Sequence, residues 1–409
     1  MEREELAAWL RLTLTSGVGN QSARKLLAAF GLPGAVFEQP TAALLQVVNA
    51  AQATALRTEP AELAAMLERT WNWLQEAGSD SQPRQIVVLG DADYPESLLH
   101  IEDPPLMLYL LGARKFISNR PIAPVDIALT AANLIANRLA ARVLHSIAVV
   151  GSRNPTPQGA ANARQFAKAL ALAGLTVVSG LALGVDGAAH EGALDSLMPD
   201  SDRLVTVAVV GTGLDRVYPR KHLDLAHRIA QNGMLLSEYP LGTPPLAPNF
   251  PKRNRLIAGL TQGTLVIEAA LKSGSLITAR LSAEQGKDVF AIPGSIHSTQ
   301  ARGCHALIKQ GAKLVESAQD VLEEMKIDAS ASLAGNFTVD CESSAATTDG
   351  SIANQDLLDA LGFDPVGLDA LQARCGLDAA NLQAQLMTLE LDGRVARLPG
   401  GLFQRMTTG

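Results

Sequence analysis

The sequence predicts an α/β protein built on a Rossmann-like doubly wound parallel sheet, with an N-terminal small helical domain and a C-terminal winged-helix domain. Short β-branched runs alternate with amphipathic stretches from residue 147 to about 315. An Ala- and Leu-rich region with a helical period precedes them, and three helical stretches with a short hairpin close the chain. Nearly continuous apolar strands separated by helices are typical of a parallel sheet covered on both faces.

Residues 1–80 form the predicted helical domain, which is of SAM or helix-hairpin-helix type. Gly17-Val18-Gly19 makes a tight turn between two short helices, because glycine permits positive φ and a close backbone approach. Such a turn either points backbone amides at a DNA phosphate or only packs two helices together, and the sequence leaves both alternatives open. Three tryptophans are expected in the core: Trp9, Trp71 and Trp73.

Residues 81–325 form the predicted Rossmann-like domain. Its strands are expected at 147–151, 176–180, 205–211, 234–238, 264–268 and 288–292, with ligands beyond their carboxyl ends. The segment 113–146 follows the strand-like run 106–112 and is an atypical insertion with one predicted helix, 126–144. It has no evident function.

The C-terminal region divides into a linker, 326–350, and a winged-helix domain, 351–409. The linker is rich in Ala, Ser, Thr and Asp, which cannot build a core. The third helix of the winged-helix domain has few basic residues, whereas Arg394, Arg397 and Arg405 lie in the hairpin. Docking to protein is therefore as reasonable an expectation as reading a DNA groove.

Composition excludes several classes of protein. The 409 residues carry 47% hydrophobic and 18% charged side chains, and the short, broken apolar runs predict no membrane span. The acidic N-terminus is not that of a signal peptide, so a cytoplasmic location is expected. Cys304, Cys341 and Cys375 are widely spaced and are expected as free thiols, with no metal site. No GxGxxG motif follows a strand, so no dinucleotide cofactor is expected.

A local basic segment stands out on a chain of formal net charge -7. Phe250, Lys252, Arg253 and Arg255 lie close together in what we expect to be a loop before the strand at 264. Cations beside an aromatic side chain favour docking of a polyanion over a generic solvated face.

Loops at three other strand ends carry further candidates. In the first loop, Gly151-Ser152-Arg153 predicts a phosphate cradle, with a simple helix cap as the alternative. The second loop has Ser179-Gly180 at a strand end, and the residues 184–186 open the helix that follows. The third loop, 211–222, supplies Arg216, Arg220 and Lys221. His190 is expected to be a helix-surface residue packed at the sheet edge and not a catalytic base, because no nucleophile is evident nearby.

These motifs together resemble the DNA-processing protein A (DprA/Smf) family. They are GSR at 151, SGLALGVDGAAH at 179, GTGLDRVYPRKH at 211, FPKRNRLIAGL at 250, SGSLITA at 273 and IPGSI at 292. The resemblance implies a homodimeric, non-enzymatic protein without a cofactor. It would bind single-stranded DNA, protect incoming DNA in natural transformation and load RecA recombinase.

The motifs also imply a set of DNA-binding residues, in which cations follow the phosphates, backbone amides cap them and Phe250 stacks on a base. The set is Gly151, Ser152, Arg153, Ser179, Gly180, Arg216, Lys221, Phe250, Lys252, Arg253, Asn254, Arg255, Lys272, Ser273, Gly274 and Ser275.

Two alternatives remain. One is a nucleotide-binding or nucleoside-monophosphate-hydrolysing enzyme of the same broad fold, which Thr264 and Glu268 echo only loosely. The other is a pure protein-interaction scaffold, which would leave the basic aromatic segment unexplained.

Overall fold

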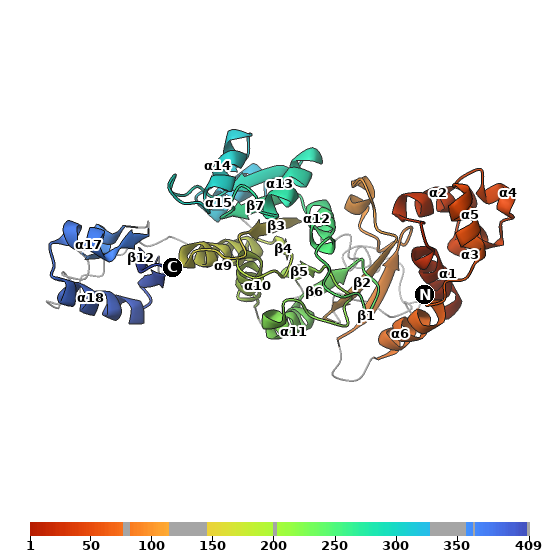
Figure 1. The fold of residues 1–409 in the computed structure, drawn as a ribbon, viewed down its shortest axis with the longest axis horizontal. Coiled ribbons are helices and arrows are strands. Elements are labelled where there is room, and N and C mark those ends of the chain that lie inside the picture. Colours follow the sequence, from red (N-terminus) through yellow and green to blue (C-terminus); the bar gives the residue numbers. More distant parts are fainter. Residues whose placement is uncertain (77–81, 114–144, 199–202, 328–356, 363–364, 407–409) are drawn as a thin grey trace, which may run out of the picture.

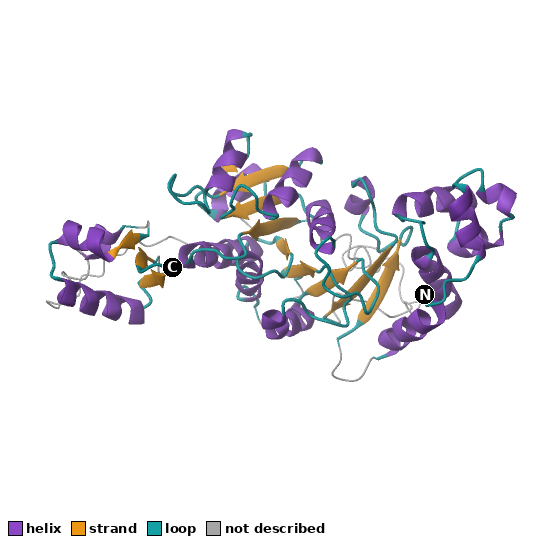
Figure 2. Cartoon of the chain, in the orientation of Figure 1, coloured by secondary structure: helices purple, strands orange, loops and turns teal. Residues whose placement is uncertain are grey.

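The computed structural model describes residues 1–76, 82–113, 145–198, 203–327, 357–362 and 365–406. The N-terminal helices lie at one end of the long axis, the central sheet lies in the middle, and the C-terminal helices and hairpin lie at the other end (Figure 1). Figure 2 shows helices on both sides of the central strands. The layers follow from the sequence, because each buried strand has apolar side chains on both faces.

The central sheet has nine strands in the order β1-β2-β6-β5-β4-β3-β7-β8-β9. Strands β3 to β9 run parallel where they pair, whereas β1 and β2 pair antiparallel at one edge, and β2 joins β6 antiparallel. The bounds are β1 Arg84–Val88, β2 Met107–Gly112, β3 Ser146–Gly151, β4 Thr176–Ser179, β5 Thr206–Val209, β6 Met234–Ser237, β7 Gly263–Ile267, β8 Asp288–Ala291 and β9 Lys313–Leu314.

The chain winds outward from β3 to β6 and then returns to place β7 on the other side of β3. This reversal makes the carboxyl ends of β3 and β7 the topological switch point, where ligands of doubly wound sheets bind. Side chains alternate along β3: Ile147 and Val149 enter one core, and Ala148 and Val150 enter the other.

Each face of the sheet is covered by its own helices. Core residues of α9, α10 and α11 pack with Ile147, whereas those of α12, α13 and α14 pack with Ala148. The bounds are α9 Pro157–Leu172, α10 Val185–Leu194, η2 Arg220–His222, α11 Leu223–Asn232, α12 Asn249–Leu260, α13 Ser275–Glu284, α14 Arg302–Lys309 and α15 Ala318–Glu324.

The N-terminal unit is helical. Its elements are α1 Arg3–Leu14, α2 Asn20–Phe30, α3 Pro33–Glu38, α4 Thr41–Leu44, α5 Ala50–Arg57 and α6 Leu63–Gln75, and η1 Glu96–His100 follows β1. Trp9 and Trp73 are buried and Trp71 is partly buried, in agreement with their predicted place in the core. Gly17 has a φ of +76°, which matches the predicted tight turn.

The C-terminal unit has a separate core and a three-stranded sheet in the order β10-β12-β11. Its elements are β10 Val366–Gly367, α17 Leu368–Cys375, α18 Ala379–Leu391, β11 Val395–Leu398 and β12 Leu402–Arg405. Gly400 and Gly401 both have positive φ in the turn between β11 and β12. The helices and hairpin are those of a winged-helix domain.

The predicted fold class is therefore confirmed, with four differences. The sequence did not indicate β1, β9 or β10, and the segment 250–255, expected as a loop, lies in α12. The predicted helix 126–144, most of the linker 326–350 and Cys341 lie outside the described residues. Among the described helices, none combines the length and apolar character that crossing a bilayer requires.

Candidate nucleic-acid interface

A hollow of about 450 Å³ opens at the switch point, beside the carboxyl ends of β3 and β7. We call it the switch-point hollow. The sequence-predicted residues that line it are Gly151, Ser152, Arg153, Phe250, Arg253, Asn254, Lys272, Ser273, Gly274 and Ser275. They come from three separate segments, so the fold brings together most of the predicted set. Ser179, Gly180, Arg216, Lys221, Lys252 and Arg255 do not line it.

The first wall is the loop after β3. A Cβ on Gly151 would lie 1.9 Å from the carbonyl oxygen of Ile267 on β7, so only glycine lets the two strand ends approach this closely. Ser152 is buried, and its Oγ accepts a hydrogen bond from the Asn154 amide at 3.1 Å. Arg153 is exposed, and its guanidinium lies 5.8 Å from the ring centroid of Phe250.

The start of α9, just beyond this loop, already holds a carboxylate. The Thr156 amide donates to Glu268 Oε2 at 2.8 Å, and the Thr156 hydroxyl donates to Glu268 Oε1. Burial raises the pKa of Glu268, and the hydrogen bonds from Thr156 oppose that shift. Because an internal anion occupies this helix terminus, the predicted phosphate cradle reduces to Arg153 and the loop backbone. The same geometry gives Glu268 a structural role.

In the second loop, after β4, a carboxylate of the protein likewise already accepts hydrogen bonds from the backbone amides. Asp186 accepts hydrogen bonds from the amides of Gly180 at 3.2 Å and Ala182 at 3.3 Å. Ser179 is buried and its hydroxyl donates to Val149 O at 2.7 Å. The amide of Gly180, predicted to cap a phosphate, therefore already has a partner within the protein.

Helix α12 divides its cations between two environments. Lys252 is exposed, whereas Arg253 is 3% exposed and donates from Nη1 to the carbonyls of Gly180, at 2.7 Å, and Val209. Burial lowers the pKa of Arg253 to about 10, and the nearby Asp186 opposes the shift. The prediction that Arg253 faces a phosphate came from treating this segment as a loop; in a helix, position 253 points at the sheet.

We call three buried side chains the buried polar layer: Asp186 and Arg253, which line the hollow, and His190. The Thr206 hydroxyl donates to Val177 O at 2.9 Å, so it accepts from His190 Nδ1 at 2.7 Å. Burial lowers the pKa of His190 to about 3. His190 is fully buried, and the expectation of a helix-surface position was wrong, because α10 packs that side against the sheet.

We call three exposed cations the cationic rim: Arg153 and Lys272, which line the hollow, and Lys252, which lies on the neighbouring helix α12 outside its lining. All three side chains are exposed, and within the described part of the chain none makes an ion pair. Lys272 precedes the Ser273 to Ser275 turn, where the two hydroxyls lie 2.6 Å apart. Asn254 donates to Gly274 O at 3.3 Å, which ties α12 to this turn.

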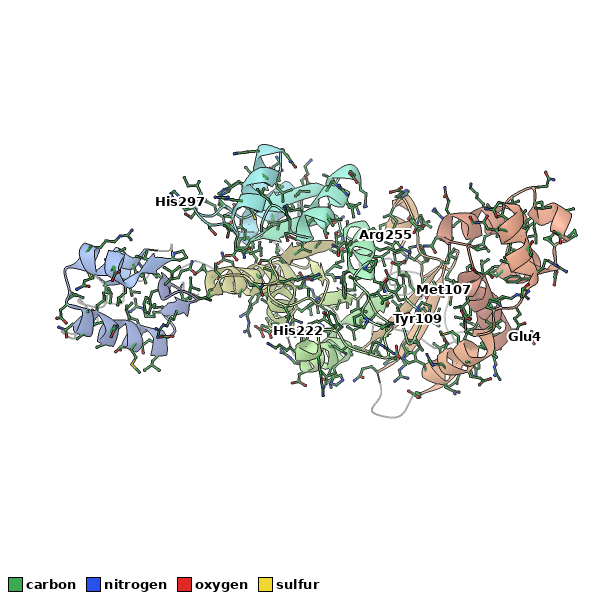
Figure 3. All side chains as sticks on the ribbon, in the orientation of Figure 1. Glu4, Met107, Tyr109, His222, Arg255 and His297 are labelled. Carbon is green, nitrogen blue, oxygen red and sulfur yellow. The ribbon has the colours of Figure 1, made fainter. Side chains whose placement is uncertain are left out.

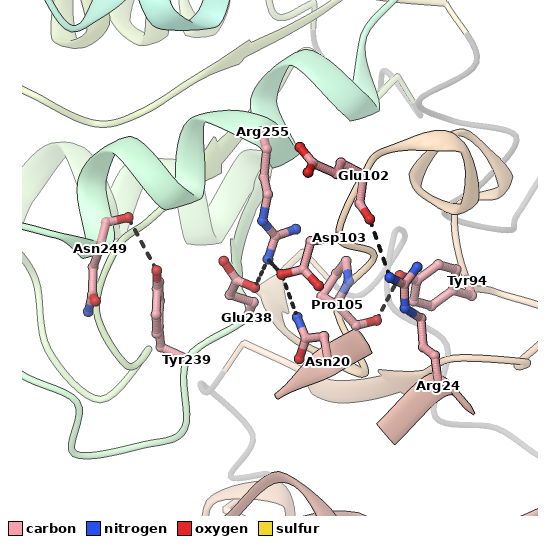
Figure 4. Close-up of polar contacts among 10 residues, drawn as sticks. All are labelled: Asn20, Arg24, Tyr94, Glu102, Asp103, Pro105, Glu238, Tyr239, Asn249 and Arg255. Atoms are coloured by element: carbon pink, nitrogen blue, oxygen red, sulfur yellow. Dashed lines mark hydrogen bonds and ion pairs between the residues drawn. The ribbon is translucent and has the colours of Figure 1, made fainter. Parts of the chain in front are cut away.

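Arg255 lies where α12 meets the residues 102–103 and the start of α2, away from the switch-point hollow (Figure 3). It pairs with Glu238 and lies 3.8 Å from Asp103, which also accepts a hydrogen bond from Asn20 at 3.1 Å (Figure 4). Arg24 donates to Glu102 O at 3.3 Å beside it. The first residue of α2 therefore meets a protein carboxylate, which favours the packing interpretation of the Gly17 to Gly19 turn.

The third predicted loop lies to one side. Arg216 forms an ion pair with Asp215 at 3.1 Å, and Asp215 also accepts a hydrogen bond from the Gly242 amide at 2.8 Å. Burial would raise the pKa of Asp215, but the Gly242 amide and Arg216 outweigh it, so this pKa is lowered. Arg220 and Lys221 are exposed in η2.

Gln300 and Thr278 also line the switch-point hollow but were not predicted from the sequence, because single polar residues in a loop and in a helix form no recognisable pattern.

Two family models match the chain. One describes DNA recombination-mediator protein A and matches residues 136–326; the other describes the DprA winged-helix domain and matches residues 342–401. Protein Smf of Escherichia coli is 37% identical over 343 residues, which cover 82% of this chain and 80% of the relative.

Two further comparisons involve Streptococcus pneumoniae. Its DNA processing protein DprA is 49% identical over 236 residues, which cover 58% of this chain and 72% of the relative. The X-ray structure of DNA processing protein A from that organism superposes with a TM-score of 0.60 at 33% identity, covering 79% of this chain and 98% of the other.

Proposed function

The chain belongs to the DNA-processing protein A (DprA/Smf) family, and from that premise we propose that it binds single-stranded DNA across the switch-point hollow. The observation that carries the proposal is the cationic rim around a hollow that also contains Phe250. Arg153 and Lys272 are exposed and line the hollow from two different segments, and both are proposed phosphate contacts. The groove then holds the backbone of a strand whose bases are free to stack.

The backbone amides that are already hydrogen-bonded within the protein narrow the proposal to side-chain contacts. Glu268 fills the start of α9 and Asp186 holds the loop after β4, so backbone amides contribute less than the rim side chains. Binding is then dominated by cation to phosphate contacts, which carry no sequence information. We therefore expect affinity to vary little with sequence and steeply with salt.

The test compares single-stranded and duplex oligonucleotides of equal length in a fluorescence anisotropy titration at two or more salt concentrations. We expect tighter binding of the single strand, because a duplex keeps its bases stacked on each other. Equal affinity for the two forms would contradict the proposal. Hydrolysis of adenosine monophosphate, measured on the same sample, tests the enzyme alternative. The engagement of Glu268 with Thr156 weighs against that alternative.

We propose further that the bound strand is handed to RecA recombinase by a homodimer, which protects incoming DNA in natural transformation. The support is the family description as a recombination mediator. The test is the rate of RecA filament assembly on DNA coated with single-strand-binding protein, with and without this chain. Sedimentation equilibrium measures the dimer. No acceleration of assembly would contradict RecA loading and leave DNA binding untouched.

A further inference from the structure

Tyr218 and Phe250 form an aromatic pair at the side of the switch-point hollow. Their ring centroids lie 5.5 Å apart with an interplanar angle of 39°. The two rings come from different elements, because Tyr218 lies in the loop after β5 and Phe250 lies in the first turn of α12. Pairing of aromatic rings at this distance is favourable in itself, and it also fixes the position of both rings.

Phe250 has little free ring surface. A Cβ on Gly211 would lie 3.2 Å from Phe250 Cδ1, so the ring rests against the Gly211 backbone. The Arg153 guanidinium lies 5.8 Å from the ring centroid, and Tyr218 lies beside it. The side chain is only partly exposed. An incoming base therefore meets a ring that already has three neighbours.

Tyr218, in contrast, is 48% exposed. The loop that carries it is fixed on both sides. Asp215 accepts the Gly242 amide at 2.8 Å, and the His222 ring, through Nδ1, lies 3.0 Å from Leu181 O. The exposed ring is thus held ready by its surroundings, which lowers the entropic cost of binding a ligand to it.

We propose that Tyr218 is a base-stacking residue for single-stranded DNA, with its ring offering the outer face and Phe250 supporting it from behind. This inference rests on the proposed function. Arg153 lies on the same Phe250 ring, so one nucleotide can place its phosphate at the guanidinium and a neighbouring base on the phenol. Stacking on an aromatic ring accepts every base, because every base has a π face.

The experiment compares two probes of equal length, an oligothymidylate and an abasic oligonucleotide that keeps the phosphates and lacks the bases. We expect the wild-type protein to prefer the oligothymidylate. Tyr218→Ala and Tyr218→Leu should weaken oligothymidylate binding about tenfold and abasic binding less than twofold. Tyr218→Phe should retain wild-type affinity, because the ring and not the hydroxyl makes the contact.

Leu223→Ala is the matched control, since Leu223 follows η2 and is 41% exposed. It should bind both probes as the wild type does. A second readout is Tyr218→Trp, whose added fluorescence should be quenched by the oligothymidylate and not by the abasic probe. This variant keeps an aromatic ring, so it tests the contact even where Tyr218→Ala loses thermal stability.

Two results would overturn the stacking role and leave DNA binding intact. One is an equal loss on both probes for Tyr218→Ala, and the other is an oligothymidylate affinity within twofold of wild type. Failure of the wild-type protein to bind either probe would overturn the proposed function together with this inference.

Discussion

The buried polar layer and the cationic rim use the same kinds of side chain for opposite purposes. Arg253 is 3% exposed and donates hydrogen bonds to the carbonyls of Gly180 and Val209, whereas the neighbouring Lys252 is exposed on the same helix. A charge in the layer holds two strand ends in place. A charge in the rim is available to a ligand. A cation near a binding site is therefore assigned to one role by its burial and its partners, not by its charge.

The largest expected effect comes from removing the cation of the layer. Arg253→Ala would leave Asp186 buried without its neighbouring positive charge and two carbonyls without a donor. Each buried carbonyl left without a donor typically costs about 1–3 kcal/mol, so the two together cost about 2–6 kcal/mol. We expect a loss of this size in the free energy of unfolding measured with urea.

Lys252→Ala, the adjacent position on α12, is the control and should change the free energy of unfolding by less than about 0.5 kcal/mol. A stable Arg253→Ala protein whose salt dependence of DNA binding is reduced would reverse the comparison. It would make Arg253 a phosphate contact.

The second prediction concerns pH. His190 has a pKa lowered to about 3 by burial, with His222 and Arg253 adding to the shift, against an ordinary value of 6.5. Between these values the unfolded chain binds a proton that the native protein does not, so stability falls as pH falls below 6.5. At pH 5 the loss is about 2 kcal/mol, from one and a half pH units.

His190→Asn keeps a donor for Thr206 and removes the titrating ring. The difference in free energy of unfolding between pH 7 and pH 5 should shrink by about 2 kcal/mol in this variant. An unchanged difference would mean that His190 is protonated in the native protein, and hence that the layer is more open to water than its burial indicates.

Helix α12 shows how far the sequence predicts which cations are buried supports and which are exposed to a ligand. The parallel strands were evident from their β-branched runs, and the loops at their carboxyl ends followed from the topology. Arginine is seldom fully buried, so Arg253 beside Lys252 and Arg255 indicated an exposed basic loop. Its actual partners, Gly180 and Val209, are 73 and 44 residues away in sequence, and no local pattern encodes such contacts.

Glu268 and Tyr218 teach the same lesson. Glu268 was considered as part of a nucleotide site, yet it is held by Thr156, which is 112 residues away. Tyr218 stood unremarked between cations, and only the approach of Phe250 from α12 marks it as part of a surface. Residue types at strand ends predict where a site lies, whereas the choice between ligand contact and internal support depends on long-range packing.

The third prediction tests the rim. Arg153→Ala should weaken single-strand binding about tenfold and lower the slope of log affinity against log salt by about 0.7, the value for one phosphate contact. The free energy of unfolding should change by less than about 0.5 kcal/mol, because the side chain is exposed. Arg228→Ala, an exposed arginine on α11, is the matched control. If Arg153→Ala instead lowered the free energy of unfolding and kept the wild-type salt slope, Arg153 would have a structural role like that of the buried polar layer and not a phosphate contact.

The smallest expected effect lies at the junction with the N-terminal helices. Asn20→Ala removes the hydrogen bond to Asp103, whose net contribution is about 1 kcal/mol. Because that bond joins two parts of the protein, the variant should lower the free energy of unfolding by this amount and leave the salt slope of DNA binding unchanged. Gln21→Ala, an exposed neighbour in the same turn of α2, should change neither. If Asn20→Ala instead lowered the salt slope with stability intact, the Gly17 to Gly19 turn would be a phosphate contact. The comparison between supporting and binding groups would then extend beyond the switch-point hollow.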